Sequence, residues 1–302
     1  MTNKVFKKIK HFYLALLSCA KPIRAKAANT PVFSYIDVSA WQMKIDWAKV
    51  KAAGIQGVII RAGIGDVLSY PGQKDEYYEY NYSECKRLGI PVGAYFYCYA
   101  QTKAEAQREA QGCLKLLAGK QFELPILYDV EEPRTFATGK TNEIIKAFAD
   151  ILEAAGWWVG IYTYKCAADA YLNDRTKTRY TMAVAQYADR CTYTSQYAIW
   201  QNSSTTRVDG ISGNVDHDWC YEDFPTKIKA KGKNGFPKPA PAPAKTLTYQ
   251  TTKETPIVSL KGTVPKGKTV KIGGRKTVCG VQYGRIDGTP DDWISLKDCK
   301  QI

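Results

Sequence analysis

The chain has 302 residues, 45% of them hydrophobic, which is enough for one large and one small domain with a substantial core, and it contains no run of eighteen apolar residues that would predict a transmembrane span. Its net charge of +14 is concentrated at the ends, with +7 in residues 1–30 and +11 in residues 226–302, so that residues 31–225 carry −4. A slightly acidic body argues against a nucleic-acid enzyme, whose positive field should surround its site, and basic ends favour contact with an anionic surface.

Residues 1–30 resemble a targeting segment in part. Four lysines precede an apolar stretch at residues 12–20, and Ala-Lys-Ala at residues 25–27 resembles a small-residue cleavage site. The apolar stretch is short, however, and three basic residues follow it. Two interpretations stay open, an export signal and a basic leader.

From residue 33 the sequence alternates between predicted strands and predicted helices. Apolar runs predict strands at residues 32–38, 57–63, 91–100 and 158–164, and a further strand that begins at residue 124. Amphipathic stretches that end at glycines, or begin at a capping pair such as Thr102 with Glu105, predict helices at residues 45–54, 79–88, 102–117 and 141–156, the last capped by Thr141, and a further helix after the fifth strand.

Beyond residue 181 we predict three more strands, at residues 182–187, 197–201 and around 208–216, with no room for full helices between them. Eight strands in about 195 residues indicate an α/β fold, a modified TIM-like barrel that is shorter than the usual ~250 residues. In such barrels the active site lies at the carboxyl ends of the strands. Asp37, Asp129 and Glu131 stand at such ends.

The stretch LPILYDVEE at residues 124–132 concentrates carboxylates at the end of a buried strand. Side chains alternate along a strand, so Asp129 and Glu131 share a face, with Cβ atoms about 6.5 to 7 Å apart. Two close carboxylates that lose water raise the pKa of at least one of them. An acid kept protonated beside an ionised partner is what glycosidic-bond cleavage requires. A solvated loop start or a helix cap is the alternative.

The C-terminal part of the sequence has a different composition. Residues 226–244 are basic and then rich in Pro and Ala, which predicts a stiff linker. Residues 245–302 contain short predicted strands separated by Gly and Pro, without a helical period. We therefore predict a separate small all-β module.

The nine cysteines form no CxxC pair and no metal-ligand spacing, and the chain has two histidines. We therefore expect no metal, no cofactor and no Cys/His nucleophile. The odd, scattered cysteines indicate thiols that are mostly reduced. Cys279 and Cys299 could pair, or remain two buried thiols.

Eight segments, in this order, resemble the glycoside hydrolase family 25 lysozymes, the Chalaropsis-type muramidases. They are YIDVSAWQ at 35–42, IDW at 45–47, GVIIRAG at 57–63, GIPVGAYFY at 89–97, LPILYDVEE at 124–132, GIYTY at 160–164, MAVAQY at 182–187 and IWQ with VDGISGNVD at 199–216. The resemblance implies a barrel over residues 31–225 that cleaves the β-1,4 bond between N-acetylmuramic acid and N-acetylglucosamine in peptidoglycan.

The resemblance also implies roles for four carboxylates. Glu131 corresponds to the general acid, and Asp129 to the residue that orients the acetamido group of the substrate, whose oxygen is the internal nucleophile unless a protein nucleophile acts instead. Asp37 and Asp216 would shape the field and bind the sugar, with Asp218 as the competitor of Asp216. The residues expected to bind substrate are Arg61, Tyr95, Tyr97, Tyr162, Tyr187 and Trp200.

The C-terminal segments GTVPKGKTVKIGG at 262–274 and DDWISLKDC at 291–299 resemble a bacterial SH3-type wall-binding module. Such a module would hold the enzyme on an anionic cell wall and raise the effective concentration of substrate.

The sequence therefore predicts a monomeric muramidase, a phage endolysin or a bacterial autolysin, that acts on cell-wall peptidoglycan after secretion or release by lysis. A catalytically inactive, lectin-like peptidoglycan-binding protein is the alternative. A wall peptidase or amidase would need a His/Cys site or zinc ligands, and the sequence does not offer them.

Overall fold

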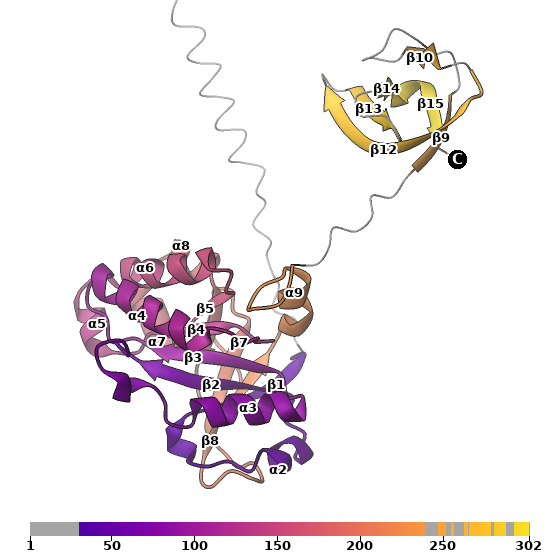
Figure 1. Ribbon diagram of the computed structural model, residues 1–302. Coiled ribbons are helices and arrows are strands. Elements are labelled where there is room, and N and C mark those ends of the chain that lie inside the picture. Colours follow the sequence, from indigo (N-terminus) through magenta and orange to yellow (C-terminus); the bar gives the residue numbers. More distant parts are fainter. Residues whose placement is uncertain are drawn as a thin grey trace, which may run out of the picture. The chain divides into compact units, whose positions relative to one another are not determined.

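The computed structural model describes residues 30–238, 247–251, 255–256, 263–264, 266–278, 281–287 and 293–301 (Figure 1). The chain divides into two compact units, Met1–Lys238 and Pro239–Ile302. The predicted leader, apart from its last residue, and one partner of the possible Cys279–Cys299 pair lie outside the described residues.

Eight strands close into a barrel in the first unit (Figure 1). In chain order they are β1 (Phe33–Val38), β2 (Gly57–Ile64), β3 (Val92–Tyr97), β4 (Ile126–Asp129), β5 (Val159–Tyr164), β6 (Thr181–Ala185), β7 (Ile199–Thr206) and β8 (Val215–Cys220). The strands β1 to β7 run parallel, and β8 runs antiparallel to both of its neighbours. The predicted barrel is confirmed.

The reversal of β8 corrects one strand prediction. The strand expected around residues 208–216 begins only at Val215, and residues 207–214 form the connection from β7. Eight residues are too few for a parallel crossover, which needs about a dozen, whereas an antiparallel hairpin can be joined by a short connection.

Helices follow the first five strands and cover the outside of the barrel. They are α2 (Trp47–Ala52), α3 (Tyr78–Leu88), α4 (Lys103–Leu117), α5 (Pro133–Ala137), α6 (Thr141–Ala154), α7 (Lys165–Tyr171) and α8 (Asp174–Arg179). The predicted capping box of Thr102 and Glu105 starts α4, whereas Thr141 is the first residue of α6 rather than its cap. Residues 180–223, all of them described, contain no helix. None of the described helices has the length and apolarity needed to cross a membrane.

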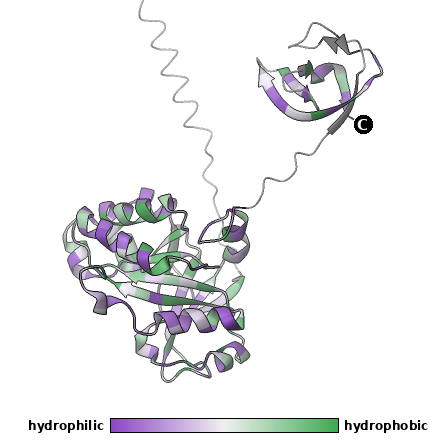
Figure 2. Ribbon diagram, viewed as in Figure 1, coloured by the Kyte–Doolittle hydropathy of each residue, from purple (hydrophilic) through white to green (hydrophobic). Residues whose placement is uncertain are grey.

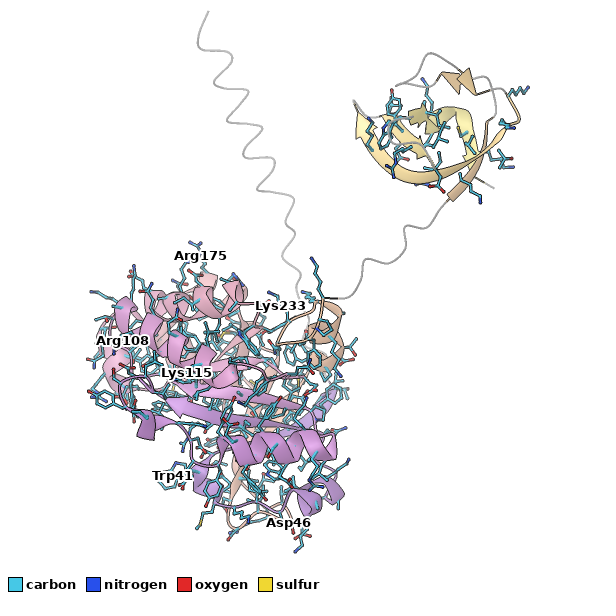
Figure 3. The ribbon with its side chains drawn as sticks, viewed as in Figure 1. Trp41, Asp46, Arg108, Lys115, Arg175 and Lys233 are labelled. Atoms are coloured by element: carbon cyan, nitrogen blue, oxygen red, sulfur yellow. The ribbon has the colours of Figure 1, made fainter. Side chains whose placement is uncertain are left out.

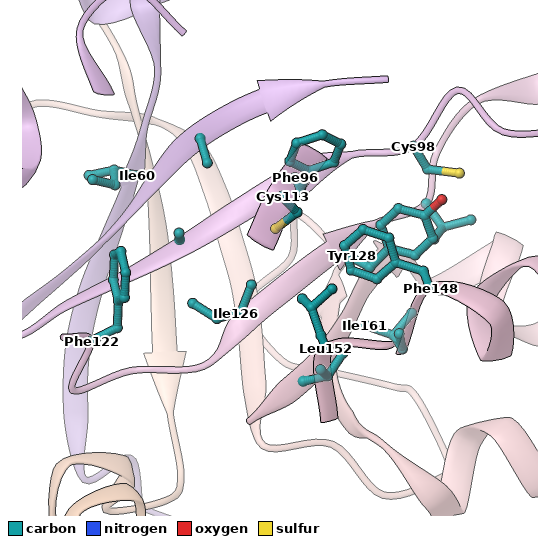
Figure 4. Close-up of a cluster of buried hydrophobic side chains, with 14 of the residues drawn as sticks. Ile60, Phe96, Cys98, Cys113, Phe122, Ile126, Tyr128, Phe148, Leu152 and Ile161 are labelled. Atoms are coloured by element: carbon teal, nitrogen blue, oxygen red, sulfur yellow. The ribbon is translucent and has the colours of Figure 1, made fainter. Parts of the chain in front are cut away.

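Strand alternation divides the core into two layers. On β1, Tyr35 faces the barrel interior, whereas Ile36 and Val38 pack against the surrounding helices. In the outer layer the ring of Tyr128 on β4 stacks on Phe148 of α6, with centroids 3.7 Å apart (Figure 4). The central strands are accordingly mostly hydrophobic, while the helices mix hydrophilic and hydrophobic residues (Figure 2). Both layers support the strand ends that carry the site.

The end of the barrel opposite those strand ends is closed by α9 (Phe224–Ala230) and the residues after it (Figure 1). Asn234 is fully buried there. Its side chain accepts a hydrogen bond from the backbone N–H of Trp158 (2.6 Å) and donates one to the carbonyl of Leu124 (2.8 Å). The predicted linker at residues 226–244 therefore begins too early, because residues up to Lys238 belong to the barrel unit.

The second unit is a small all-β module, as predicted. Ile272, Ile294 and Leu296 form its buried core. Five strands form one sheet in the order β14 (Trp293–Ser295), β13 (Val281–Ile286), β12 (Thr269–Val278), β9 (Leu247–Thr251) and β15 (Cys299–Gln301), beside the pair β10 (Thr255–Pro256) and β11 (Thr263–Val264).

Replacement of Asn234 by Ala should destabilise the barrel by about 2–4 kcal/mol, because it leaves two buried backbone groups unpaired and puts a residue with a Cβ but no polar side chain at φ 54°. The measurement is denaturant unfolding followed by tryptophan fluorescence. Asn214→Ala, at an exposed position, is the matched control. Equal unfolding free energies for the two variants would show that the Asn234 side chain does not stabilise the barrel.

Candidate active site

A cleft of about 230 Å³ opens at the carboxyl ends of the parallel strands. Its walls carry carboxyl groups, phenols, one guanidinium and one indole. The lining residues are Asp37, Trp41, Ile59, Arg61, Tyr95, Tyr97, Leu127, Asp129, Glu131, Tyr162, Tyr187, Gln201, Asp216 and Asp218.

The four carboxylates singled out in the sequence meet in this cleft. Asp37 near the end of β1 lies opposite Asp216 of β8 in the strand register. Asp129 ends β4, and Glu131 follows two residues later on the same side, while Val130 between them is buried in the outer core. The alternation that predicted a shared face for Asp129 and Glu131 therefore holds beyond the end of the strand.

Burial raises the pKa of the Asp129 and Glu131 carboxyls. For Asp129 the rise is large, and the negative charges of Glu131 and Asp37 add to it, while the positive charge of Arg61 opposes it. For Glu131 burial is also the largest cause, the neighbouring hydroxyl of Tyr162 opposes it, and the charge of Asp216 adds to it. The cleft therefore favours protonated carboxylic acids, since ionised groups here lose water and repel one another.

The pKa values of the carboxyls on β1 and β8 are raised as well. Burial raises the pKa of Asp216 to about 6. Burial, and then the charge of Asp216, raise the pKa of Asp37 to about 7. Asp218, a further carboxyl two residues along β8, is 3% exposed, and its pKa is raised well above the usual range by burial and by the charge of Asp37. Sequence reasoning treated Asp218 as a rival of Asp216, but both line the cleft.

Arg61 is the single cation among the described residues that line the cleft. Its Nε donates to Asp75 Oδ2 at 2.8 Å. The Asp75 carboxylate is buried and also accepts hydrogen bonds from the backbone N–H groups of Ala40 (2.8 Å) and Tyr77 (3.0 Å). Arg61 therefore both forms a structural ion pair and faces the cleft. Asp75 was missed, because nothing in its loop sequence marks it as the partner of a strand residue.

Gln201 connects three side chains of the cleft. Its amide nitrogen donates to Asp37 Oδ2 at 2.7 Å, and its amide oxygen accepts from the hydroxyls of Tyr162 (2.9 Å) and Tyr187 (3.0 Å). The sequence analysis missed Gln201, although it directly follows Trp200 in the predicted strand.

The assignment of Trp200 as a substrate-binding residue is not supported by its position. Side chains alternate along β7, so Gln201 faces the barrel interior and Trp200 faces the outer wall. The Trp200 side chain is nearly buried there, and its Nε1 donates to the carbonyl of Gln186. The other five residues expected to bind substrate all line the cleft.

Trp41 was also missed. It lies on the short helix η1 (Ala40–Gln42), which Ser39 caps two residues after Asp37. Trp41 is 83% exposed on the barrel unit (Figure 3). It is also one of the residues that line the cleft. An exposed indole beside a polar cleft is suited to stack on a sugar ring.

In the described part of the chain, no group of three or more His, Cys, Asp or Glu residues is arranged to hold a metal ion.

Comparison with known proteins identifies the same region. The sequence model of the family "Glycosyl hydrolases family 25" matches residues 36–211 of this chain. Lysozyme M1 of Streptomyces globisporus is 37% identical over 215 residues, which cover 63% of this chain and 68% of that protein.

Two solved structures share the fold of the barrel. The bacterial lysozyme of Streptomyces coelicolor is 25% identical with a TM-score of 0.56, covering 68% of this chain and 98% of that one. The modular autolysin LytC of Streptococcus pneumoniae, in complex with a synthetic peptidoglycan ligand, is 28% identical with a TM-score of 0.55. The match covers 62% of this chain but only 46% of LytC, so the likeness does not extend to the rest of that protein. The family match includes more than half of the chain and three of the four predicted carboxylates, and the chain therefore belongs to glycosyl hydrolases family 25.

Proposed function

We propose that the protein is a peptidoglycan muramidase, which hydrolyses the β-1,4 bond between N-acetylmuramic acid and N-acetylglucosamine. Membership of the family and relatives named as lysozymes support this function. The observation that carries it is the pair of Asp129 and Glu131 in one cleft, both with a raised pKa. A lectin-like protein would bind sugar without needing a protonated acid, so these carboxyls favour the enzyme.

Glu131 is the general acid in this account. It is less buried than Asp129, and it lies where a glycosidic oxygen in the cleft can reach it. A raised pKa keeps the group protonated until it transfers its proton to the leaving oxygen.

Asp129 receives and orients the acetamido group of the substrate. Its Oδ1 is buried and has no hydrogen-bond partner among the described residues. The N–H of an acetamido group would supply the missing donor and turn the amide oxygen towards the anomeric carbon. We therefore favour the internal nucleophile over a covalent intermediate on the protein.

The remaining groups bind the sugar and stabilise developing positive charge. Asp37 and Asp216 contribute negative potential to the oxocarbenium-like transition state in a cleft partly screened from water. Trp41, Tyr97 and Tyr187 present partly exposed aromatic surface at the cleft, on which sugar rings can pack.

The second unit is assigned as an SH3-like module that binds the cell wall. Its all-β sheet supports the assignment. The whole protein would act as a monomer on the wall outside the cell, as an endolysin or an autolysin, after secretion or release by lysis.

Glu131→Gln should lower the release of reducing ends from purified peptidoglycan by about 1,000-fold or more, because the amide cannot protonate the leaving oxygen. Glu132→Gln is the matched control, since its side chain pairs with Arg134 outside the cleft. Activity of the Glu131 variant within tenfold of wild type would remove Glu131 from the role of acid.

The pH dependence of kcat/KM should include a decline as the pH rises through the pKa of Glu131, because only its protonated form is active. The charge of Asp216 helps to raise that pKa. Asp216→Asn should therefore lower the Glu131 pKa and move the decline to lower pH. A decline that moves to higher pH, or stays in place, would contradict this coupling.

Removal of residues 239–302 should leave kcat/KM on short soluble glycans unchanged, because the cleft lies wholly in the first unit. Binding to intact walls should fall by about 100-fold, since the second attachment point is lost. Co-sedimentation with walls measures binding. Unchanged binding would contradict the wall-binding role of the module.

A further inference from the structure

A fifth carboxyl group, that of Asp218, lies beneath the four predicted ones. On β8 the residues Asp216, Asp218 and Cys220 face the barrel interior, and Asp218 pairs in register with Tyr35 of β1 and Gln201 of β7. Its side chain is within hydrogen-bonding reach of the Asp37 carboxyl. Two carboxyl groups from neighbouring strands therefore meet at the base of the cleft.

The surroundings of the two carboxyls differ. Asp37 Oδ2 accepts a hydrogen bond from the Gln201 amide at 2.7 Å. Asp218 Oδ2 is buried, and no donor from the described part of the chain reaches it. Arg61, the single cation among the described residues that line the cleft, is already paired with Asp75. The structure thus supplies a donor to Asp37 Oδ2 and, among the described residues, none to Asp218 Oδ2.

Two adjoining buried anions with no cation between them repel strongly, so such a contact is stable when the pair holds one proton. We infer that Asp37 and Asp218 share one proton, and that Asp218 is a positioning residue whose O–H donates to Asp37 and keeps it an anion during the reaction. This inference rests on the proposed muramidase function only for its effect on activity.

The shared proton explains how Asp37 can stay charged at a pH at which the general acid is protonated. A general acid must be protonated while Asp37 is charged, yet burial and the charge of Asp216 push the Asp37 pKa to about 7. The ionisable groups that face the pair are the carboxyls of Asp129, Glu131 and Asp216, the phenols of Tyr95, Tyr162 and Tyr187, and the thiol of Cys220. All of these are acids, and Arg61, the one cation among the described lining residues, is paired with Asp75. The donated O–H of Asp218, together with the Gln201 amide, is therefore a main source of stabilisation for the Asp37 anion.

Two substitutions of Asp218 separate this role from simple packing. Asp218→Asn keeps a hydrogen-bond donor, because an amide N–H can replace the acid O–H. Asp218→Leu keeps the branching at Cγ, is larger and has no donor. Asp223→Asn, at the N-cap of α9 outside the cleft, is the matched control, since Asn also caps helices.

We expect Asp218→Asn to retain most of the wild-type kcat/KM at its optimum, with the acid limb of the pH profile unchanged or at lower pH. Asp218→Leu should lose about 100-fold, the scale of losing one preorganised electrostatic group, and its acid limb should move to higher pH because Asp37 then takes up a proton more easily. Equal losses in both variants, with unshifted acid limbs, would show a packing role and overturn the inference.

An infrared measurement tests the shared proton without relying on activity. At pH 8 the carbonyl band of protonated carboxylic acids should lose intensity in Asp218→Asn relative to wild type, and should be unchanged in Asp223→Asn. An unchanged band in Asp218→Asn would overturn the inference even if the Leu variant does not fold. A wild type that shows the band but releases no reducing ends would instead overturn the proposed function.

Discussion

Electrostatic crowding in the cleft is the constraint on which the rest of this structure depends. Five carboxyl groups line one small cavity, and Arg61, the single cation that the described residues contribute to its lining, is already paired with Asp75. Such a cluster is stable only if some of its members stay protonated. A site that holds protonated and ionised carboxyls side by side is the requirement of acid-assisted glycoside hydrolysis, so the same crowding that costs stability supplies the chemistry.

The rest of the barrel unit offsets this destabilisation by packing helices around the strands and by closing the end of the barrel opposite the cleft. Helices cover the strands that carry Asp37 and Asp129, and stacking such as that of Tyr128 on Phe148 holds β4 directly before the end from which Asp129 and Glu131 reach the cleft. At the opposite end of the barrel, Asn234 fixes the beginnings of β4 and β5. The chain after the last barrel strand thus completes the domain, although its composition resembles that of a linker.

Local pattern made much of this architecture predictable, and the remainder depended on contacts between distant residues. The apolar run ending in DVEE located a strand whose end carries two carboxyls on one side, and alternation along β7 would have placed Gln201 rather than Trp200 in the cleft. The pairing of Arg61 with Asp75 and the contact of Asp218 with Asp37 could not be inferred, because each joins separate elements through side chains. The structural role of Asn234 was not predicted, because the basic, glycine-containing sequence around it resembles a linker.

The most direct test of the account is the identity of the sugar left at the new chain end. Peptidoglycan digested by the full-length protein would be reduced with borohydride and hydrolysed, and the reduced amino sugars would be identified by mass spectrometry. The account predicts reduced N-acetylmuramic acid, at a level that rises with digestion time. Reduced N-acetylglucosamine would assign the cleavage to the other glycosidic bond, and the absence of any reduced sugar would show that the cleft binds the wall without hydrolysing it.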